Sequence, residues 1–354
     1  MAVYTTIDNP ELFFQTKKYT GTGSSNSITL DGSENMQPDW VWIKRLTAAD
    51  HKLTDSVRGV TKVIESNNTA EESTDSNGLT AFNSDGFTVG SSASFNSNTV
   101  GFVSWNWKAG TSFTNDASST GIGTIDSTGS VNETAGFSIV SYTSTGSNAS
   151  LKHGLSTAPQ WIIFKRRSGD TENWPNFHQA LGNTHYMMLN ASDGSSDSAA
   201  RFNDTSPTSS VFTVGTSGDT NGGTSPFICY CFSERQGYSK FQSYTGNGNA
   251  NGSYIHLGFK PAWVMIKSTA GGEDWFIWDN KRNSFNKSFN PYLLASQNNA
   301  EYDGSGAFAE LLSNGFKIKG TSAYLNGSGQ SYIYMAFAEQ PFVTGASAIP
   351  ATAR

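Results

Sequence analysis

Short apolar runs separated by polar, turn-forming residues recur along the whole chain. Runs of about four to eight apolar residues bounded by turn signals indicate β-strands. Trp161–Phe164 and Trp263–Ile266 are apolar at every position, which predicts strands covered on both faces. Each run follows a proline at a position where a strand can begin. A similar run, Trp40–Ile43, precedes Lys44. The three runs end at Lys44, Lys165 and Lys267, which we expect to return the chain to solvent.

The turns and the composition favour the same class of fold. Asp-Gly and Asn-Gly pairs, such as Asp85-Gly86 and Asn314-Gly315, tolerate the positive φ that hairpin turns require. Only 15% of the residues are charged, whereas the chain has 36 glycines and is rich in Ser, Thr and Asn. Because exposed helices favour Glu, Lys, Ala and Leu, we expect an all-β protein with aromatic cores.

Four motifs recur three times in the same order, at a spacing of roughly 100–120 residues. The first is Tyr-Thr-Gly-x-Gly or a close variant, at Tyr19, Tyr142 and Tyr244. The second is Pro-x-Trp followed by apolar residues and lysine, with its tryptophan at Trp40, Trp161 and Trp263. The third centres on Phe87, Phe212 and Phe316. The fourth is an aromatic strand at 102–107, 227–232 and 332–337.

These repeats predict three tandem β-sandwich units of a lectin or jelly-roll type, since about 100 residues is the size of a small sandwich. We expect the recurring Trp and Phe positions of the second and third motifs to form their cores. The predicted boundaries are an N-terminal segment at 1–11, units at 12–110, 136–235 and 237–341, a flexible Ser/Thr/Gly linker at 111–135 and a C-terminal tail at 342–354. The linker lets the first unit sit apart, whereas the other two should pack together.

Charge and hydropathy argue against several classes of partner. The net charge is −6 and no Lys/Arg cluster is present, which disfavours nucleic-acid binding. We find no apolar run long enough for a membrane span and no secretory signal, so we expect no membrane insertion. The two cysteines, Cys229 and Cys231, predict packing and no disulfide framework.

Candidate chemistry is sparse, and we predict no catalytic residue, no metal site and no cofactor. Asp55 and Arg58 recur as Asp279 and Arg282, which indicates a local ion pair or, alternatively, a sugar-binding aspartate. Tryptophans outside the repeated positions are candidates for stacking against a glycan at the surface. The candidate glycan contacts are therefore Trp42, Trp174, Trp275, Trp278, Asp55 and Asp279.

The order of these motifs resembles a repeat found in virion structural proteins of marine tailed phages that are described as tail-fibre-like. The residues that carry the resemblance are Tyr142–Lys165, Phe212–Glu234, Tyr244–Lys267 and Phe316–Glu339, with Met1–Phe14, Gln37–Lys44 and Ile349–Arg354. The first unit departs from the pattern, because it ends in Trp107-Lys108-Ala109 instead of Phe-x-Glu. The resemblance implies a place on the virus particle and no particular ligand.

We therefore expect a non-enzymatic virion protein, assembled in the bacterial cytoplasm and displayed on the particle surface as a tail-fibre or spike component in host attachment. Its expected partners are other virion proteins, a host surface glycan and further copies of itself, although three internal units could also mimic a trimer within one chain. One alternative is a capsid decoration protein on the head. A second is a tailspike-like enzyme that degrades polysaccharide, which requires paired carboxylates about 5–9.5 Å apart.

Overall fold

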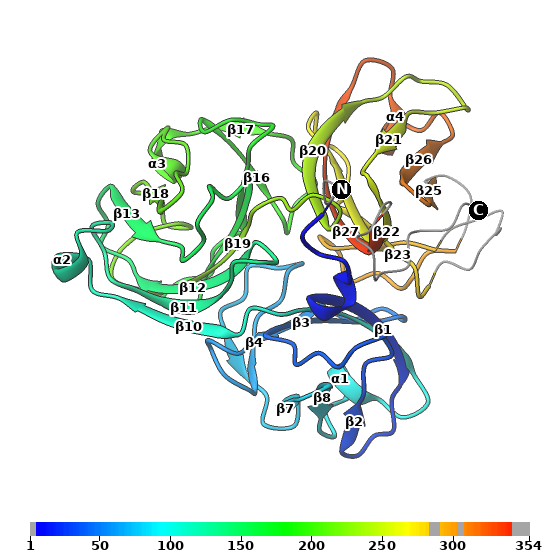
Figure 1. Cartoon of the computed structure of the whole chain (residues 1–354), viewed down its shortest axis with the longest axis horizontal. Coiled ribbons are helices and arrows are strands. Elements are labelled where there is room, and N and C mark those ends of the chain that lie inside the picture. The colour runs from blue at the N-terminus through cyan, green and yellow to red at the C-terminus, as the bar shows by residue number, and fades with distance from the viewer. Residues whose placement is uncertain (1–4, 283–290, 304–307, 342–354) are drawn as a thin grey trace.

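The computed structural model describes residues 5–282, 291–303 and 308–341, and these are nearly all β, arranged in several antiparallel sheets. The predicted all-β class is therefore confirmed. The predicted tail at 342–354 lies outside the described residues. We refer below to a first segment (residues 5–110), a second (111–235) and a third (237–341). Figure 1 shows them as three lobes around a common centre.

The first segment contains a large and a small sheet. The large sheet has the order β1 (Phe14–Thr20), β9 (Gly101–Trp107), β3 (Trp40–Arg45), β4 (Lys52–Asp55). The small sheet has the order β2 (Asn26–Ile28), β8 (Gly86–Val89), β7 (Leu79–Asn83). The remaining elements are the 3-10 helix η1 (Pro10–Leu12), α1 (Ala93–Asn96), β5 (Lys62–Val63) and β6 (Ser73–Thr74).

The second segment repeats this order and adds strands at both sides. Its large sheet runs β10 (Thr111–Asn115), β11 (Ser127–Asn132), β12 (Phe137–Thr143), β19 (Pro226–Phe232), β14 (Trp161–Arg166), β15 (Pro175–His178), β16 (His185–Met188), β17 (Ser196–Asp197). The small sheet pairs β13 (Ala149–Lys152) with β18 (Val211–Val214). Its helices are α2 (Ala117–Thr120) and α3 (Ala199–Phe202).

The third segment has the same strand order again. Its large sheet runs β20 (Ser239–Thr245), β27 (Ser331–Pro341), β22 (Phe259–Ser268), β23 (Phe276–Asp279), β24 (Leu293–Leu294). Its small sheet runs β21 (Tyr254–His256), β26 (Gly315–Lys319), β25 (Phe308–Leu312), and its helix is α4 (Ala323–Asn326). In all three large sheets, the strand that contains the tryptophan of the Pro-x-Trp motif pairs with the aromatic strand of the fourth motif.

The central strands of each large sheet are buried at almost every position. Because successive side chains of a strand point to opposite sides, these strands are covered on both faces. One face packs on the small sheet of the same segment: Val41 and Ile43, for example, contact the cluster that contains Phe87. The opposite faces of all three large sheets meet in one shared core. The predicted core positions are confirmed, since each is at most 1% exposed: Trp40, Trp161, Trp263, Phe87, Phe212 and Phe316.

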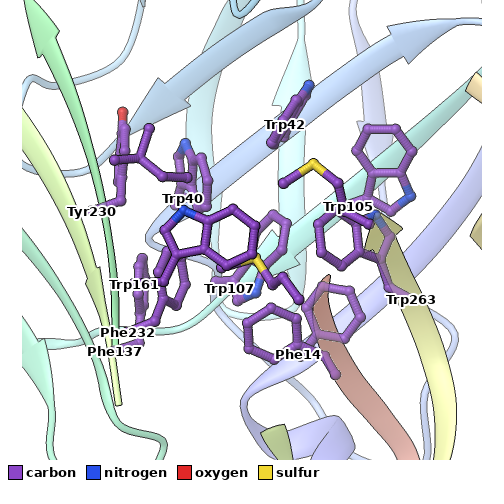
Figure 2. Close-up of a cluster of buried hydrophobic side chains, with 14 of the residues drawn as sticks. Phe14, Trp40, Trp42, Trp105, Trp107, Phe137, Trp161, Tyr230, Phe232 and Trp263 are labelled. Carbon is purple, nitrogen blue, oxygen red and sulfur yellow. The ribbon is translucent and has the colours of Figure 1, made fainter. Parts of the chain in front are cut away.

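Aromatic rings fill the shared core (Figure 2). Trp40 of the first segment stacks on Tyr230 of the second, with ring centroids 4.2 Å apart and planes 16° apart. Trp107 of the first segment meets Trp263 of the third edge to face at 5.7 Å. Large aromatic side chains bury about 150–250 Å² each, so these contacts dominate the packing between segments. The expectation that the first unit sits apart is therefore wrong.

The expectation of a flexible linker at 111–135 is also wrong. These residues form β10, α2 and β11, and β11 pairs along its whole length with β12. Composition misled here because strands at the side of a sheet need few apolar side chains when the backbone is paired. The Phe113 ring lies over Gly129 of the neighbouring strand, where a Cβ would approach within 2.7 Å of the ring. This contact anchors the added strands to the sheet.

We expect thermal or denaturant unfolding to be a single transition, because the three segments share one core. Trp40→Ala should lower the free energy of unfolding by about 3–5 kcal/mol, the usual cost of removing a buried tryptophan side chain. The transition should stay single, and Val60→Ala, at an exposed position in the first segment, should change it little. Circular dichroism and tryptophan fluorescence would follow the unfolding. Separate transitions for the segments would contradict a shared core.

Candidate functional site

The residues predicted to contact a glycan are all buried. Asp55 ends β4 opposite Trp40, and Asp279 ends β23 opposite Trp263. Both aspartates have no exposed surface. The four tryptophans at Trp42, Trp174, Trp275 and Trp278 are at most 1% exposed. The prediction that these six side chains face solvent is wrong, and their contacts show that most of them join segments.

Asp55 holds the first segment to the second. Its Oδ2 accepts hydrogen bonds from Arg58 Nε at 2.5 Å and from the Tyr230 hydroxyl at 2.7 Å. Its Oδ1 accepts from the backbone N–H of Arg58 at 2.8 Å. Burial alone would lower the pKa of Arg58, but Asp55, Tyr230 and Glu72 outweigh burial and raise it. The ion pair is thus fully buried and satisfied, which such a pair needs in order not to destabilise the fold.

Asp279 makes the same arrangement between the third segment and the first. Its Oδ2 accepts from Arg282 Nε at 2.5 Å and from Trp105 Nε1 at 3.1 Å. Its Oδ1 accepts from the backbone N–H of Arg282 at 2.9 Å. Trp105 and Tyr230 occupy the same position of the fourth motif, so each aspartate is bonded by the corresponding aromatic residue of another segment.

The junction between the second and third segments lacks this ion pair. His178 stands opposite Trp161, where the other segments have aspartate. Met335, three residues after Tyr332, takes the place of Tyr230 and Trp105 and offers no N–H or O–H donor. Burial lowers the pKa of His178 to about 3, so the ring is neutral at ordinary pH. Its Nδ1 accepts a hydrogen bond from the Ala180 backbone N–H at 3.1 Å.

A second contact occurs at all three junctions. Trp174 Nε1 donates to the Asn68 carbonyl at 3.1 Å, and Trp275 Nε1 donates to the Met188 carbonyl at 2.8 Å. In the first segment His51 takes this role: its Nε2 lies 2.9 Å from the Leu294 carbonyl. The Trp42 indole donates to His51 Nδ1 at 2.8 Å, which leaves the proton of the neutral ring on Nε2.

Backbone bonds repeat the same cyclic order. In each, an N–H of one segment donates to the carbonyl two residues after the lysine of the second motif in another segment: Glu72 to Arg167 at 2.8 Å, Ser195 to Thr269 at 3.0 Å and Glu301 to Leu46 at 2.8 Å. The first segment thus bonds to the second, the second to the third and the third to the first. Such head-to-tail contacts close a ring when the rotation between neighbours allows it.

The lysines expected to reach solvent are buried instead, and two of them bond across these junctions. Lys44, Lys165 and Lys267 have no exposed surface. Lys165 Nζ donates to the Thr69 carbonyl of the first segment at 3.0 Å, and Lys267 Nζ donates to the Ser192 carbonyl of the second at 3.0 Å. Burial lowers the pKa of each lysine to about 8. Backbone carbonyl oxygens take the place of water around these ammonium groups. A lysine at the end of an apolar run does not reveal such partners in the sequence.

The Tyr-Thr-Gly-x-Gly motif forms a rigid loop at the surface. In the first segment the Tyr19 hydroxyl donates to the Phe95 carbonyl at 2.7 Å, and Gly23 has a φ of 71°. Asn96, which is fully buried, accepts from the Thr22 N–H at 2.8 Å and donates to the Gly90 carbonyl at 2.8 Å. The Asn96 amide therefore ties the loop to the residue that follows β8.

The other two segments contain the same lock. Asn221 bonds the Thr145 N–H and the Gly215 carbonyl, and Asn326 bonds the Asn247 N–H and the Gly320 carbonyl. We call these three turns, at residues 21–25, 144–148 and 246–251, the asparagine-locked loops. Their tips are mostly exposed and carry Ser, Thr, Asn and Gly. They are exposed polar turns that buried asparagine side chains hold in place.

A shallow groove of about 410 Å³ lies beside the strands that only the second segment has. Its acids already serve the local fold: Asp116 caps α2, and Asp126 accepts from the Ala117 N–H at 2.8 Å. Arg167 at its edge pairs with Glu72 of the first segment. The lining residues include Thr114, Asn115, Ser127, Thr128, Ser141 and Thr143. The groove offers hydroxyl and amide groups to a ligand.

Metal and thiol chemistry find little support in the described part of the chain. Among those residues, no three His, Cys, Asp or Glu side chains lie close enough together to hold a metal ion. Cys229 and Cys231 are buried and free, and burial raises the pKa of both thiols. Within the same residues, no helix has the length and apolar character needed to cross a membrane.

We expect Tyr230→Phe to lower the free energy of unfolding by about 1.5–3 kcal/mol, because it removes a buried hydrogen bond to a charged carboxylate. Tyr238 provides the matched control. It is equally buried, but its hydroxyl finds no hydrogen-bond partner in the described structure, so Tyr238→Phe should be neutral or stabilising. Denaturant titrations of both variants make the comparison, and equal losses would refute the role of Asp55 as an acceptor between segments.

The buried lysines predict an unusual pH dependence. Between pH 8 and 10.5 the unfolded chain binds more protons at Lys165 than the folded chain, so the contribution of this residue to stability rises with pH in that window. Relative to Lys165→Met, the wild-type protein should gain up to about 1.4 kcal/mol per pH unit there. Unfolding measured at several pH values tests this. A difference between the two proteins that does not vary with pH would rule it out.

Comparison with known sequences places the chain in a family without assigning it an activity. No curated protein matches the sequence. One family model, described as a domain of unknown function (DUF7483), matches residues 9–341 and so runs through all three segments. The chain therefore belongs to the DUF7483 family.

Proposed function

We propose that this protein is a non-enzymatic structural component of a bacteriophage virion, displayed on the particle surface as part of a tail fibre or spike in host attachment. Its three segments are tandem β-sandwich repeats, closed into a ring within one chain. The resemblance of the motifs to tail-fibre-like proteins suggests the location. The repeated strand order and the cyclic contacts support the architecture.

One observation carries the proposal: aspartate and histidine side chains, which could otherwise serve in catalysis, connect the segments to one another. Asp55 and Asp279 bond buried arginines and an aromatic donor from another segment. His51 likewise bridges two segments. The two aspartates lie in different junctions, so they do not form the carboxylate pair that glycoside cleavage requires. These contacts hold the three segments in a fixed arrangement.

The surface supplies the contact function. The asparagine-locked loops expose polar residues of low charge on a rigid support, which suits recognition of hydroxyl-rich molecules such as host glycans. Three copies of the loop allow weak contacts to act together by avidity. Other virion proteins anchor the ring to the particle.

A second candidate is decoration of the capsid head. Three similar junctions in a cyclic order give the ring an approximate threefold arrangement, and a head lattice offers sites of threefold symmetry. This role uses the same rigidity but needs no receptor. The location of the protein on the particle separates the two roles.

Gold-labelled antibodies against the purified protein, applied to intact particles and viewed by electron microscopy, should label the tail fibres or the tail tip. An unrelated antibody of the same class serves as the control. Gold on the head shell would contradict the role in host attachment and support decoration of the capsid. Gold on neither structure, with the protein absent from purified particles by mass spectrometry, would overturn both.

A further inference from the structure

Four aromatic rings of the third segment form a continuous series of ring contacts with an exposed tyrosine at each end, which we call the tyrosine patch: Phe276, Tyr292, Tyr302 and Tyr324. Tyr302 packs on Tyr292 with centroids 4.9 Å apart, and Tyr292 packs on Phe276 at 5.1 Å. Tyr324 lies 5.9 Å from Phe276, nearly parallel to it at 26°. Tyr302 is 47% exposed and Tyr324 is 45% exposed, whereas the two inner rings are at most 9% exposed.

The exposed rings stand at positions where the other two segments have different side chains. Strand register places Tyr302 opposite Tyr292, where the other segments have Ser73 opposite Val63 and Ser196 opposite Tyr186. Two residues before the locking asparagine, Tyr324 replaces Ser94 of the first segment and Asp219 of the second. Both exposed tyrosines therefore belong to the third segment alone, on a scaffold that folds with serine or aspartate there.

The patch rests on a firm base. Trp278 is fully buried and lies 5.8 Å from Phe276, with the two rings only 13° from parallel, and 6.1 Å from Tyr292. This tryptophan was a candidate for direct glycan contact, and its place beneath the patch makes it a positioning residue. Packing fixes the inner rings, and the outer tyrosines lie against them. The outer rings therefore lose little conformational entropy when a ligand binds.

Polar groups lie beside the rings. Asp274, two residues before Phe276, accepts hydrogen bonds at Oδ1 from Ser296 Oγ at 2.8 Å and from Gln297 Nε2 at 3.0 Å. Burial chiefly, then Tyr302, Tyr324 and Asp274, raise the pKa of Tyr292 to about 12. A pyranose ring has the matching chemistry, with C–H groups on its faces and hydroxyls around its edge.

The size of the patch also favours a sugar over a protein. Two tyrosines that each expose less than half of their surface offer roughly 200 Å² of contact. A stable protein interface buries about 800 Å² on each partner. One or two sugar rings fit the smaller area.

We propose that the tyrosine patch binds pyranose units of a neutral polysaccharide, with Tyr302 and Tyr324 contacting the C–H faces of the sugar and Asp274 its hydroxyls. This inference deepens the proposed role in attachment and rests on it. It also assigns binding to the third segment in addition to the three asparagine-locked loops.

Affinity electrophoresis in native gels that contain dextran or mannan tests the proposal with the intact protein. At least one polysaccharide should retard the wild-type protein relative to a gel without it. Tyr302→Ala and Tyr324→Ala should each weaken binding about tenfold or more, whereas Tyr302→Phe, which keeps the ring, should stay within about threefold of wild type. Tyr254→Ala is the matched control, because Tyr254 is an equally exposed tyrosine on β21, outside the patch.

Circular dichroism must show that the variants are folded, which their exposed positions favour. No retardation in either gel, or retardation that the two alanine variants leave unchanged, would overturn the tyrosine patch as a saccharide site. Loss of binding to another virion protein in these variants, without any retardation, would also overturn it. Particle labelling does not depend on these tyrosines, so surface labelling combined with a negative gel result removes only this inference.

Discussion

The structure depends on one constraint: each large sheet is apolar on both of its faces, and a single segment can cover only one. The small sheet of the same segment covers the outer face. The inner face carries tryptophans such as Trp40, Trp161 and Trp263, and the inner faces of the other two segments cover it. Burial of apolar area is the main favourable term in folding, so the segments stabilise one another. The family model that spans residues 9–341 is consistent with the ring as the unit that folds.

Apolar packing alone does not fix which edges of the segments meet, because it has little directional preference. The directional contacts are polar. Asp55 receives a bond from the second segment and Asp279 from the first, and both aspartates are neutralised by their own arginine. A wrong arrangement would remove the donor that each buried carboxylate receives from another segment, at a cost of about 1–3 kcal/mol. The junction with His178 and Met335 lacks this device, so the charged junctions discriminate most strongly against a different order.

The sequence predicted the β class and the core positions because both follow from short-range patterns. The paired motifs marked Trp40, Trp161 and Trp263 as structural, and burial agrees. The same reasoning failed for Trp174 and Trp275. These two occupy one position, four residues before His178 and Asp279, and His51 stands there in the first segment. The substitution of histidine and the unequal loop lengths hid the correspondence, which only strand register reveals.

The failures at the lysines and at residues 111–135 have a common cause. Sequence patterns report the environment that a residue type usually prefers, and both features depend on partners far away in the chain. Lys165 is buried because the Thr69 carbonyl lies within 3.0 Å of its ammonium group. The polar strand β11 is ordered because β12 pairs with it. Nothing within either segment encodes these partners, so composition favoured solvent in both cases.

The division between inner and outer positions explains how a repeated scaffold can acquire binding at one place. Substitutions on the inner faces disturb a core that all three segments share, so these positions are constrained together. Tyr302 and Tyr324 are exposed, and the other segments have Ser73, Ser196, Ser94 or the buried Asp219 at the corresponding places. Exposed positions of this kind usually alter stability by less than about 0.5 kcal/mol when substituted. A ring held together from inside can therefore vary its surface one segment at a time without disturbing the shared core.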